Sequence, residues 1–264
     1  MNFKQICESA LPIIQETGSF IEQEKNKISR SDIEDKGTHN FVTYVDKQAE
    51  QMLVKGLSAL LPEAGFITEE ETVHQDKRVY RWVIDPLDGT TNFIHKCPPF
   101  AVSVALMEGE KTVAGIVYEI CLKECFYSWK NGPALLNGSE IRVSKTSQLR
   151  NTFIATGFPY YAFDRLEPFM KTLEFFFRYS PGVRRLGSAA TDLAYVACGR
   201  FDAFYEYNLN PWDVAAGAFI VEQAGGRASD FSAGENYIFG KEIIATNGFV
   251  HDEFLQAVKQ FMVS

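Results

Sequence analysis

Two aspartates at the end of an apolar stretch are the residues of this sequence whose chemistry most needs an explanation. Asp85 and Asp88 belong to the string WVIDPLDGTTNF, which begins at Trp82. The bulky residues before Asp85 predict a short buried strand, and Pro86, which has no N–H to donate, is expected to end its pairing. No Lys or Arg lies between the two carboxylates, so they repel each other. Either they belong to an ordinary Asp-Gly turn, or they share a bound cation.

Further acidic residues stand at the ends of predicted elements. Glu69 and Glu70 follow the apolar run GFIT, and Asp213 opens the predicted helix PWDVAAGAFIVEQ. Asp46 lies where an apolar stretch becomes a helix. Each has an ordinary explanation: a solvated acidic run, a charge that suits a helix N-terminus, or an N-terminal cap. Their recurrence at element ends favours a shared site, and all-oxygen ligands suit a hard ion such as Mg²⁺.

The residues after Asp88 fit the binding of a phosphate group. Gly89 allows a close approach of the backbone, and the segment from Thr90 can begin a helix whose free N–H groups face an anion. Phosphatases use several metal ions to hold the attacking and leaving oxygens of the reaction. Acids and phosphate-binding turn together predict a metal-dependent phosphatase.

The pattern of elements predicts two layered α/β halves, residues 1–145 and 146–264. The first half reads as two helices, with apolar stripes from Ile6 to Ile21 and from Val45 to Leu60, around a mixed-charge loop at 29–40, and then as strands. Apolar runs at 100–109, 112–120 and 124–130 predict an antiparallel meander, and a short hairpin is expected after it. The second half alternates strands and helices, with helices expected at 165–180, 188–199, 211–226 and 251–262 and strands at 151–157, 200–207 and 242–247.

Composition narrows the classes of function and the compartment. The chain has 264 residues, 46% of them hydrophobic and 23% charged, which is typical of a globular protein with a full core. Its net charge of −8 gives no electrostatic basis for general nucleic-acid binding. No signal peptide or membrane-spanning stretch is evident, and five cysteines without framework spacing favour a reduced cytoplasm. Cys121 and Cys125 have no second Cys or His cluster beside them, so a strand surface is favoured over zinc.

The chain resembles the inositol monophosphatase family, which belongs to a wider superfamily of Mg²⁺-dependent, lithium-sensitive phosphatases. Two family signatures are complete, WVIDPLDGTTNF and WDVAAG, the second beginning at Trp212. The similarity continues through KGTHNFVTYVD, GFITEE, VRRLGSAATDLAYVACGRFDAFYE and EQAGG, and it is weaker around residues 156–159. The resemblance implies a five-layer α-β-α-β-α sandwich of the sugar-phosphatase type, an enzyme with two or three Mg²⁺ ions per site, and a homodimer.

The resemblance also implies a role for individual residues. The implied metal ligands are Glu69, with Glu70 beside it, Asp85, the Leu87 carbonyl, Asp88 and Asp213. The implied catalytic groups are Thr90 paired with Asp46, which orient the attacking water, together with Glu69 and Lys36 in the loop near the metals. The implied substrate contacts are the N–H groups of Gly89 and Thr90, then Gly187, Ala189 and Glu206. In this scheme one Mg²⁺ activates water and another stabilises the departing alkoxide.

The substrate stays open at this point. Myo-inositol 1-phosphate is the first candidate, and fructose 1,6-bisphosphate, histidinol phosphate or a 3′-phosphonucleotide would use the same chemistry. A different class is an interaction protein that uses the phosphatase fold as a partner surface, since some bacterial relatives assist transcription or ribosome assembly. Arg184 and Arg185 read as an exposed pair that would suit such a role. The intact ligand set argues against an inactive enzyme.

Overall fold

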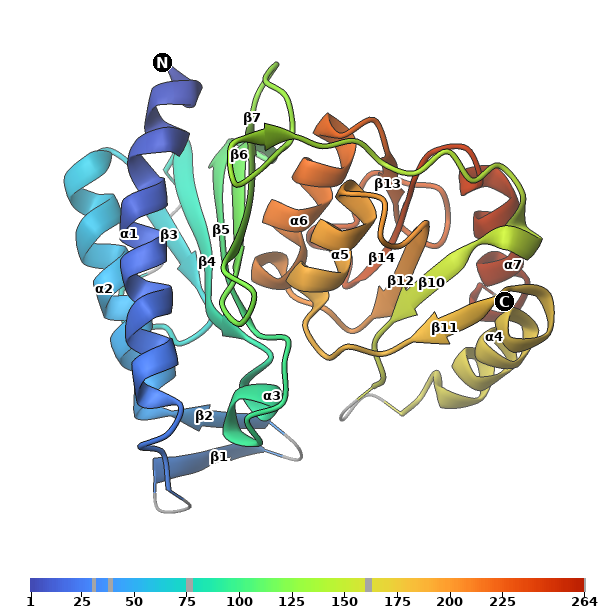
Figure 1. The fold of residues 1–264 in the computed structure, drawn as a ribbon, viewed down its shortest axis with the longest axis horizontal. Coiled ribbons are helices and arrows are strands. Elements are labelled where there is room, and N and C mark those ends of the chain that lie inside the picture. Colours follow the sequence, from blue (N-terminus) through green and yellow to red (C-terminus); the bar gives the residue numbers. More distant parts are fainter. Residues whose placement is uncertain (30–31, 38–39, 75–77, 160–162, 264) are drawn as a thin grey trace.

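The protein forms five stacked layers that alternate between helices and sheets (Figure 1). The computed structural model describes the chain except residues 30–31, 38–39, 75–77, 160–162 and 264, and the side chains of residues 33–41 are also outside the description. The layers run helix, sheet, helix, sheet, helix across the long axis of the molecule. The α-β-α-β-α sandwich predicted from the sequence is confirmed.

The first sheet has 7 strands, which follow one another in chain order. β3 and β4 are parallel, and every later neighbour pairs antiparallel, so the predicted meander and hairpin are both present. Helices α1 (Phe3–Glu24) and α2 (Tyr44–Leu60) cover the outer face. The strands are β3 (Gly65–Thr68), β4 (Tyr80–Asp88), β5 (Ala101–Glu108), β6 (Lys111–Glu119), β7 (Glu124–Trp129), β8 (Leu135–Leu136) and β9 (Ser139–Glu140).

The second sheet has 5 strands in the order β11-β10-β12-β14-β13. Helices α4 (Leu166–Tyr179) and α7 (His251–Met262) cover its outer face. Helices α5 (Ala189–Ala197) and α6 (Pro211–Gln223) form the central layer between the two sheets. The strands are β10 (Phe153–Thr156), β11 (Gly182–Arg184), β12 (Ala203–Tyr207), β13 (Arg227–Ser229) and β14 (Glu242–Thr246).

The central helices are nearly apolar all round because both of their faces are covered. One buried cluster joins Val83 and Val117 of the first sheet to Leu193 of α5 and Val214 of α6. Burial on this scale is the main favourable contribution to folding. Because the same cluster contains residues from both sheets, the N-termini of α5 and α6 are held against the end of β4. The division into halves at residues 1–145 and 146–264 stays a prediction.

Local sequence explains where the helices near the site begin. Thr43 caps α2, and Asp46, three residues on, reaches back to the Thr43 N–H in a capping box. Asn210 and Asp213 make the equivalent arrangement at α6, with Pro211 at the first helical position. Asp46 and Asp213 can therefore act both as helix caps and as residues of a site, because one carboxylate oxygen caps the helix and the other stays available.

Strand β4 differs from the prediction at Pro86. The strand does not end there but continues to Asp88, which pairs with Ala101 of β5. The pairing is irregular between Asp85 and Asp88, so the proline lies in the irregular segment where no ladder hydrogen bond is needed from it. This segment is also the one that carries the acidic motif.

Several short elements were not expected from the sequence. The mixed-charge segment at 29–40 contains β1 (Ile33–Gly37), which pairs with β2 (Asn40–Thr43), where a loop was predicted. Edge strands β11 and β13 have three residues each, too few for a period to be recognised. A helix after Gly89 was anticipated and is present as α3 (Thr90–Ile94). Among the described residues, no helix is long and apolar enough to cross a membrane.

Candidate active site

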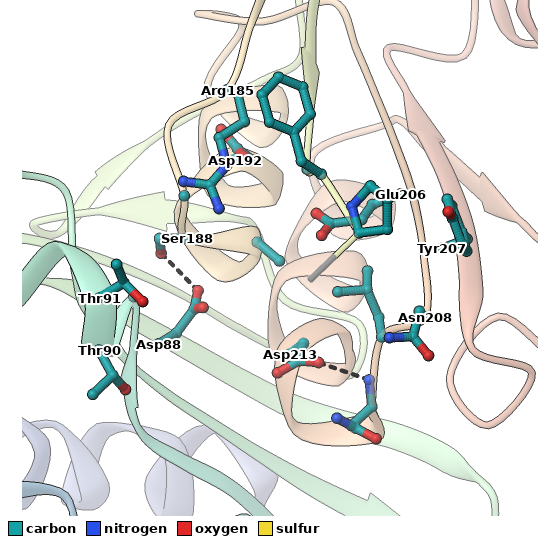
Figure 2. A pocket seen from close by; sticks show the side chains of 18 of the residues that line it. Asp88, Thr90, Thr91, Arg185, Ser188, Asp192, Glu206, Tyr207, Asn208 and Asp213 are labelled. Atoms are coloured by element: carbon teal, nitrogen blue, oxygen red, sulfur yellow. Dashed lines mark hydrogen bonds between the residues drawn. The ribbon is translucent and has the colours of Figure 1, made fainter. Parts of the chain in front are cut away.

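A cavity lies where β4, α3 and the N-termini of α5 and α6 meet, and Figure 2 shows it from close by. Of the predicted metal ligands, Glu69, Asp88 and Asp213 line it. The predicted substrate contacts also line it, and they are Gly89, Thr90, Gly187, Ala189 and Glu206. Residues from the two sheets and from the central helices thus converge on one hollow, although they are spread from position 69 to position 213 of the chain.

Asp85 and Glu69 form an acid pair at the cavity wall, where Glu69 lines the cavity and Asp85 is buried behind it. Asp85 is 2% exposed, and its Oδ1 accepts a hydrogen bond of 2.9 Å from the N–H of Leu87. The two carboxyl groups lie close enough for each to shift the pKa of the other. Desolvation raises the pKa of both groups well above the usual values, and the charge of Asp213 raises both further. Such a pair is costly to ionise unless a cation compensates it.

Asp88 is fixed by donors from the central layer. Its Oδ2 accepts hydrogen bonds from the Ser188 hydroxyl at 2.6 Å (Figure 2) and from the Ala190 N–H at 2.7 Å. Desolvation raises the pKa of Asp88 to about 6, and the hydrogen bonds from Ser188 and Ala190 oppose that shift. The acid at the end of β4 is therefore positioned by the first turn of α5, which lies about a hundred residues later in the chain.

Asp213 faces the same space from the first turn of α6. Its Oδ2 accepts a hydrogen bond of 2.6 Å from the Asn210 N–H (Figure 2). Desolvation raises the pKa of Asp213 well above its usual value, and the charge of Asp88 is the next largest cause. Asp88 and Asp213 thus repel each other across the cavity.

Thr90 and Asp46 are in hydrogen-bond contact. The Thr90 hydroxyl lies 3.0 Å from Asp46 Oδ1 and also 3.0 Å from the Leu87 carbonyl. The other carboxylate oxygen, Oδ2 of Asp46, accepts hydrogen bonds from the Thr43 N–H at 2.9 Å and the Thr43 hydroxyl at 2.6 Å. Asp46 is 1% exposed, and desolvation raises its pKa while the hydrogen bonds from Thr43 oppose that rise. The predicted Thr–Asp pair is present as a geometric contact.

Gly89 and Gly157 make room for the cavity. Gly89 has a φ of 95°, and an added Cβ would lie 3.1 Å from the Pro99 carbonyl oxygen and 3.2 Å from that of Gly187. At Gly157 a Cβ would lie 1.9 Å from the carboxyl carbon of Glu206, so any side chain there would displace this acid. The segment at 156–159, where the family resemblance is weaker, therefore forms part of the wall beside Glu206.

Glu206 stands at the end of the cavity away from Thr90 and Asp213 (Figure 2). Desolvation raises the pKa of Glu206 to about 8, the charge of Asp88 contributes in the same direction, and Arg185 opposes the rise. Arg185 lines the same end, and its guanidinium lies 5.7 Å from the Phe158 ring centroid. The interpretation of Arg184 and Arg185 as an exposed pair is thus wrong for Arg185, which is half-buried at the cavity, and right for Arg184.

Two further buried acids belong to the region and were not singled out from the sequence. Glu50 of α2 is 0% exposed and accepts hydrogen bonds of 2.7 Å from the Glu70 N–H, the Thr72 N–H and the Thr72 hydroxyl. Asp192 of α5 is 1% exposed and lines the cavity. A signal existed for Glu50, which lies one helical turn after Asp46 on the same face of α2. Asp192 reads in sequence as an ordinary acid in a first helical turn.

Two predicted residues are placed only in part. Glu70 follows Glu69 and contributes its N–H to Glu50. Lys36 lies in β1, but its side chain is outside the described part of the structure. The structure therefore brings together the other predicted site residues, whose roles stay predictions.

The donor set fits Mg²⁺ by its chemistry and charge. Glu69, Asp85, Asp88 and Asp213 offer only oxygen, and Arg185 is the one cationic side chain among the described cavity-lining residues. The carboxylates raise one another's pKa, which is the repulsion that a cation would relieve. Within the described residues, no three such side chains lie close enough together to hold a metal ion as they stand.

Comparison with known proteins gives consistent results. The family model described as the inositol monophosphatase family matches residues 3–262. A Nus factor SuhB from Salmonella typhimurium is 44% identical over 80% of this chain and 80% of its own length. An inositol-1-monophosphatase from Mesorhizobium japonicum is 36% identical over 92% of both chains. The crystal structure of extragenic suppressor protein suhB from Bartonella henselae has a TM-score of 0.91 and 34% identity, covering 96% of this chain and 98% of that one.

Proposed function

Because this chain belongs to the inositol monophosphatase family, we propose that it is a Mg²⁺-dependent phosphatase that hydrolyses myo-inositol 1-phosphate or a related inositol monophosphate. The observation that carries the proposal is the meeting of two groups of residues at one cavity. Buried carboxylates that repel one another lie beside a Thr–Asp pair joined at 3.0 Å. Across the same cavity stands Glu206, an acid on an otherwise apolar strand.

The proposed ions would be held by Glu69, Asp85, the Leu87 carbonyl, Asp88 and Asp213. When bound, two or three Mg²⁺ ions would neutralise phosphate charge, lower the pKa of the attacking water and stabilise the departing oxygen. A cation held by Glu69 and Asp85 would offset the negative charge that desolvation disfavours on both carboxyl groups. Asp88 and Asp213 keep one oxygen on a helix N-terminus, which fixes the orientation of the other oxygen.

Thr90 and Asp46 account for the direction of attack. When the Thr90 hydroxyl donates to Asp46, its lone pairs are left to accept a hydrogen bond from a water molecule. That water is then oriented by a side chain whose own position is fixed by the Thr43 contacts of Asp46. The N–H groups of Gly89 and Thr90 are the proposed contacts of the phosphate oxygens. A group held in this way lowers the barrier by orientation rather than by covalent chemistry.

Glu206 supports an alcohol with several hydroxyl groups as the substrate. A charged acceptor strengthens hydrogen bonds from hydroxyls to about 1.5–3 kcal/mol each. The Mesorhizobium relative is named for inositol 1-phosphate chemistry, which supports the same choice. Glu206→Gln should therefore lower kcat/KM for inositol 1-phosphate about tenfold to a hundredfold and change that for a hydroxyl-free aryl phosphate far less. Equal losses on both would make Glu206 a general support of the site.

The experiment that tests the proposal is phosphate release from a panel of esters, with Mg²⁺ and after chelation. Inositol 1-phosphate should give the highest kcat/KM, and chelation should abolish release. If fructose 1,6-bisphosphate, histidinol phosphate or a 3′-phosphonucleotide ranks first, the substrate is replaced by that compound. Absence of phosphate release from every ester would overturn the proposed phosphatase activity. We propose Li⁺ inhibition on the family resemblance alone, and full activity at high millimolar Li⁺ would contradict it.

A second candidate is a partner role in transcription. The Salmonella relative named a Nus factor supports it, and Arg184 is exposed beside the cavity residue Arg185. The two roles can coexist, because binding of a partner does not need the metal ligands. A pull-down of transcription complexes with the wild-type chain and with Arg184→Ala, run beside the phosphate-release assay, separates them. Cytoplasmic location is part of the proposal, and the five free cysteines support it.

A further inference from the structure

Asp192 is a buried carboxyl group at the cavity that the proposed mechanism does not use. It lies in α5, one turn after Ser188, and its backbone N–H donates to the Ser188 carbonyl at 2.9 Å. The residue is 1% exposed and lines the cavity, and its Oδ1 has no hydrogen-bond partner among the described residues. A buried carboxyl oxygen without a partner is costly, so a ligand that supplies a donor would be bound favourably.

Asp192 has two charged neighbours at the same end of the cavity. Figure 2 places Arg185, Asp192 and Glu206 together, with Thr90 and Asp213 toward the opposite end. Desolvation raises the pKa of Asp192 well above its usual value, the charge of Glu206 raises it next, and Arg185 opposes the rise. The charge of Glu206 therefore acts on Asp192, and the Arg185 guanidinium stabilises the charged form of both acids.

The charge balance of the cavity shows what this end accepts. The described lining residues include the acids Glu69, Asp88, Asp192, Glu206 and Asp213 against the one cation Arg185. If the metals are held as proposed, Glu69, Asp88 and Asp213 are compensated by them. Asp192 and Glu206 are then left with Arg185, an excess of acid over base. Hydroxyl groups suit such a wall, and a second phosphate group would be repelled by it.

We propose that Asp192 is a second specificity-determining residue, which with Glu206 forms a carboxylate pair that hydrogen-bonds the hydroxyls of a polyol and disfavours an alcohol carrying a second phosphate. Arg185 holds the pair together by sharing its charge between the two acids. The inference rests on the proposed phosphatase function and narrows its substrate class to uncharged polyols esterified once. It separates inositol 1-phosphate from bisphosphates within the same chemistry.

The test is a ratio of kcat/KM values for inositol 1-phosphate and inositol 1,4-bisphosphate. The wild-type ratio should favour the monophosphate, and Asp192→Asn, which keeps the shape and loses the charge, should narrow it about tenfold. Arg185→Gln should change the ratio in the opposite direction, because it removes the cation that attracts a second phosphate. The control is Asp202→Asn, another buried acid, which accepts from the Phe153 N–H at 2.6 Å outside the cavity and should leave the ratio unchanged.

The possible outcomes distinguish a failure of the role proposed for Asp192 from a failure of the proposed phosphatase function. A folded Asp192 variant with an unchanged ratio overturns the role of Asp192 while the phosphatase stands. If Asp192→Asn does not fold, a ratio that Arg185→Gln leaves unchanged or narrows overturns the proposal. If the wild type acts on other esters but on neither inositol compound, the ratio is measured with fructose 1-phosphate and fructose 1,6-bisphosphate. Absence of release from every ester overturns both.

Discussion

Asp213 can be neutralised without breaking the helix that it caps. Asp213→Asn keeps an oxygen that can accept from the Asn210 N–H, so α6 should still begin at Pro211. The change removes one charged ligand of a hard ion, and we expect phosphate release at saturating Mg²⁺ to fall by more than about a hundredfold. It also removes the repulsion from Asp88, so the metal-free variant should melt at a higher temperature than the metal-free wild type.

Thermal melting without metal and phosphate release with metal check this prediction together. Glu222→Gln is the control, since Glu222 lies on the same helix, bonds to the Tyr237 hydroxyl and is outside the cavity. It should leave release within about twofold of wild type. Near-normal release in Asp213→Asn would remove this residue from the ligand set.

Single residues of the site could be predicted from sequence where their types and spacing carry the chemistry. Asp85, Asp88 and Gly89 lie within one string, and the end of a strand is a known place for ligands. Asp192 and the contact of Gly157 with Glu206 could not be predicted in this way. Their meaning depends on which side of a helix or loop faces the cavity, and that is set by packing between the two sheets.

At the scale of elements, Glu50 connects α2 to the loop after β3. Three hydrogen bonds of 2.7 Å hold the backbone of residues 70 and 72 and the Thr72 hydroxyl to one buried carboxylate. Glu50→Gln would turn an amide N–H₂ toward some of these donors and leave them unpaired. We expect the free energy of unfolding to fall by about 1–3 kcal/mol and the apparent affinity for Mg²⁺ to weaken, because Glu69 and Glu70 lie on this loop.

Chemical denaturation and a Mg²⁺ titration of activity measure the two effects. Glu16→Gln is a suitable control, because Glu16 is exposed on α1 and its substitution changes the net charge by the same amount as Glu50→Gln. An unaltered Mg²⁺ dependence in a destabilised Glu50 variant would limit Glu50 to a structural role.

His251 at the start of α7 should make stability depend on pH. The ring is 0% exposed, and its nitrogens lie 3.2 Å from the Ser229 hydroxyl and 3.1 Å from the Thr246 hydroxyl. Burial lowers the pKa of His251 from 6.5 to about 4, and the charge of Arg227 adds to this. The folded state therefore resists a proton that the unfolded chain accepts. The contribution is complete above pH 6.5 and is lost as the pH falls toward 4.

The difference in unfolding free energy between wild type and His251→Gln isolates this group from the acids. It should shrink by about 2 kcal/mol between pH 7.5 and pH 5, at about 1.4 kcal/mol per pH unit below the unfolded pKa. Urea denaturation at both pH values measures it. His95→Gln, at an exposed position, should show no such change, and a difference independent of pH for His251→Gln would contradict the prediction.

Elements with a long periodic pattern were predicted well, and short ones were not. Helices such as α4 and α7 have enough turns for an apolar stripe to be recognised, and both lie where they were expected. The strands β1, β11 and β13 are defined by partners rather than by composition. The continuation of β4 past Pro86 depends on an irregular pairing with β5, which only the register of the neighbouring strand fixes.

At the scale of the whole molecule, the order of the five layers was implied by the family resemblance, whereas the pattern of elements alone predicted only two layered α/β halves. The central helix α6 is apolar nearly all round, which is typical of a helix covered on both faces. How the cavity forms between the layers could not be predicted without the family resemblance. Residues 88, 188 and 213 meet only because the two sheets hold α5 and α6 between them.

The predicted homodimer has a candidate interface on α4. Leu166, Met170 and Phe177 are 39%, 51% and 62% exposed, and their spacing places them along one side of the helix. Solvated apolar side chains in such a row are typical of a surface that another protein covers, and a second copy of the chain would bury both rows against each other. Phe177→Lys should therefore shift the protein from dimer to monomer, because a charge in the centre of an apolar interface is costly to desolvate.

Light scattering after gel filtration gives the mass of the wild type and of each variant. Lys171→Ala, a polar position on the same helix, should stay dimeric, and a wild type that elutes as a monomer at micromolar concentration would contradict the dimer itself.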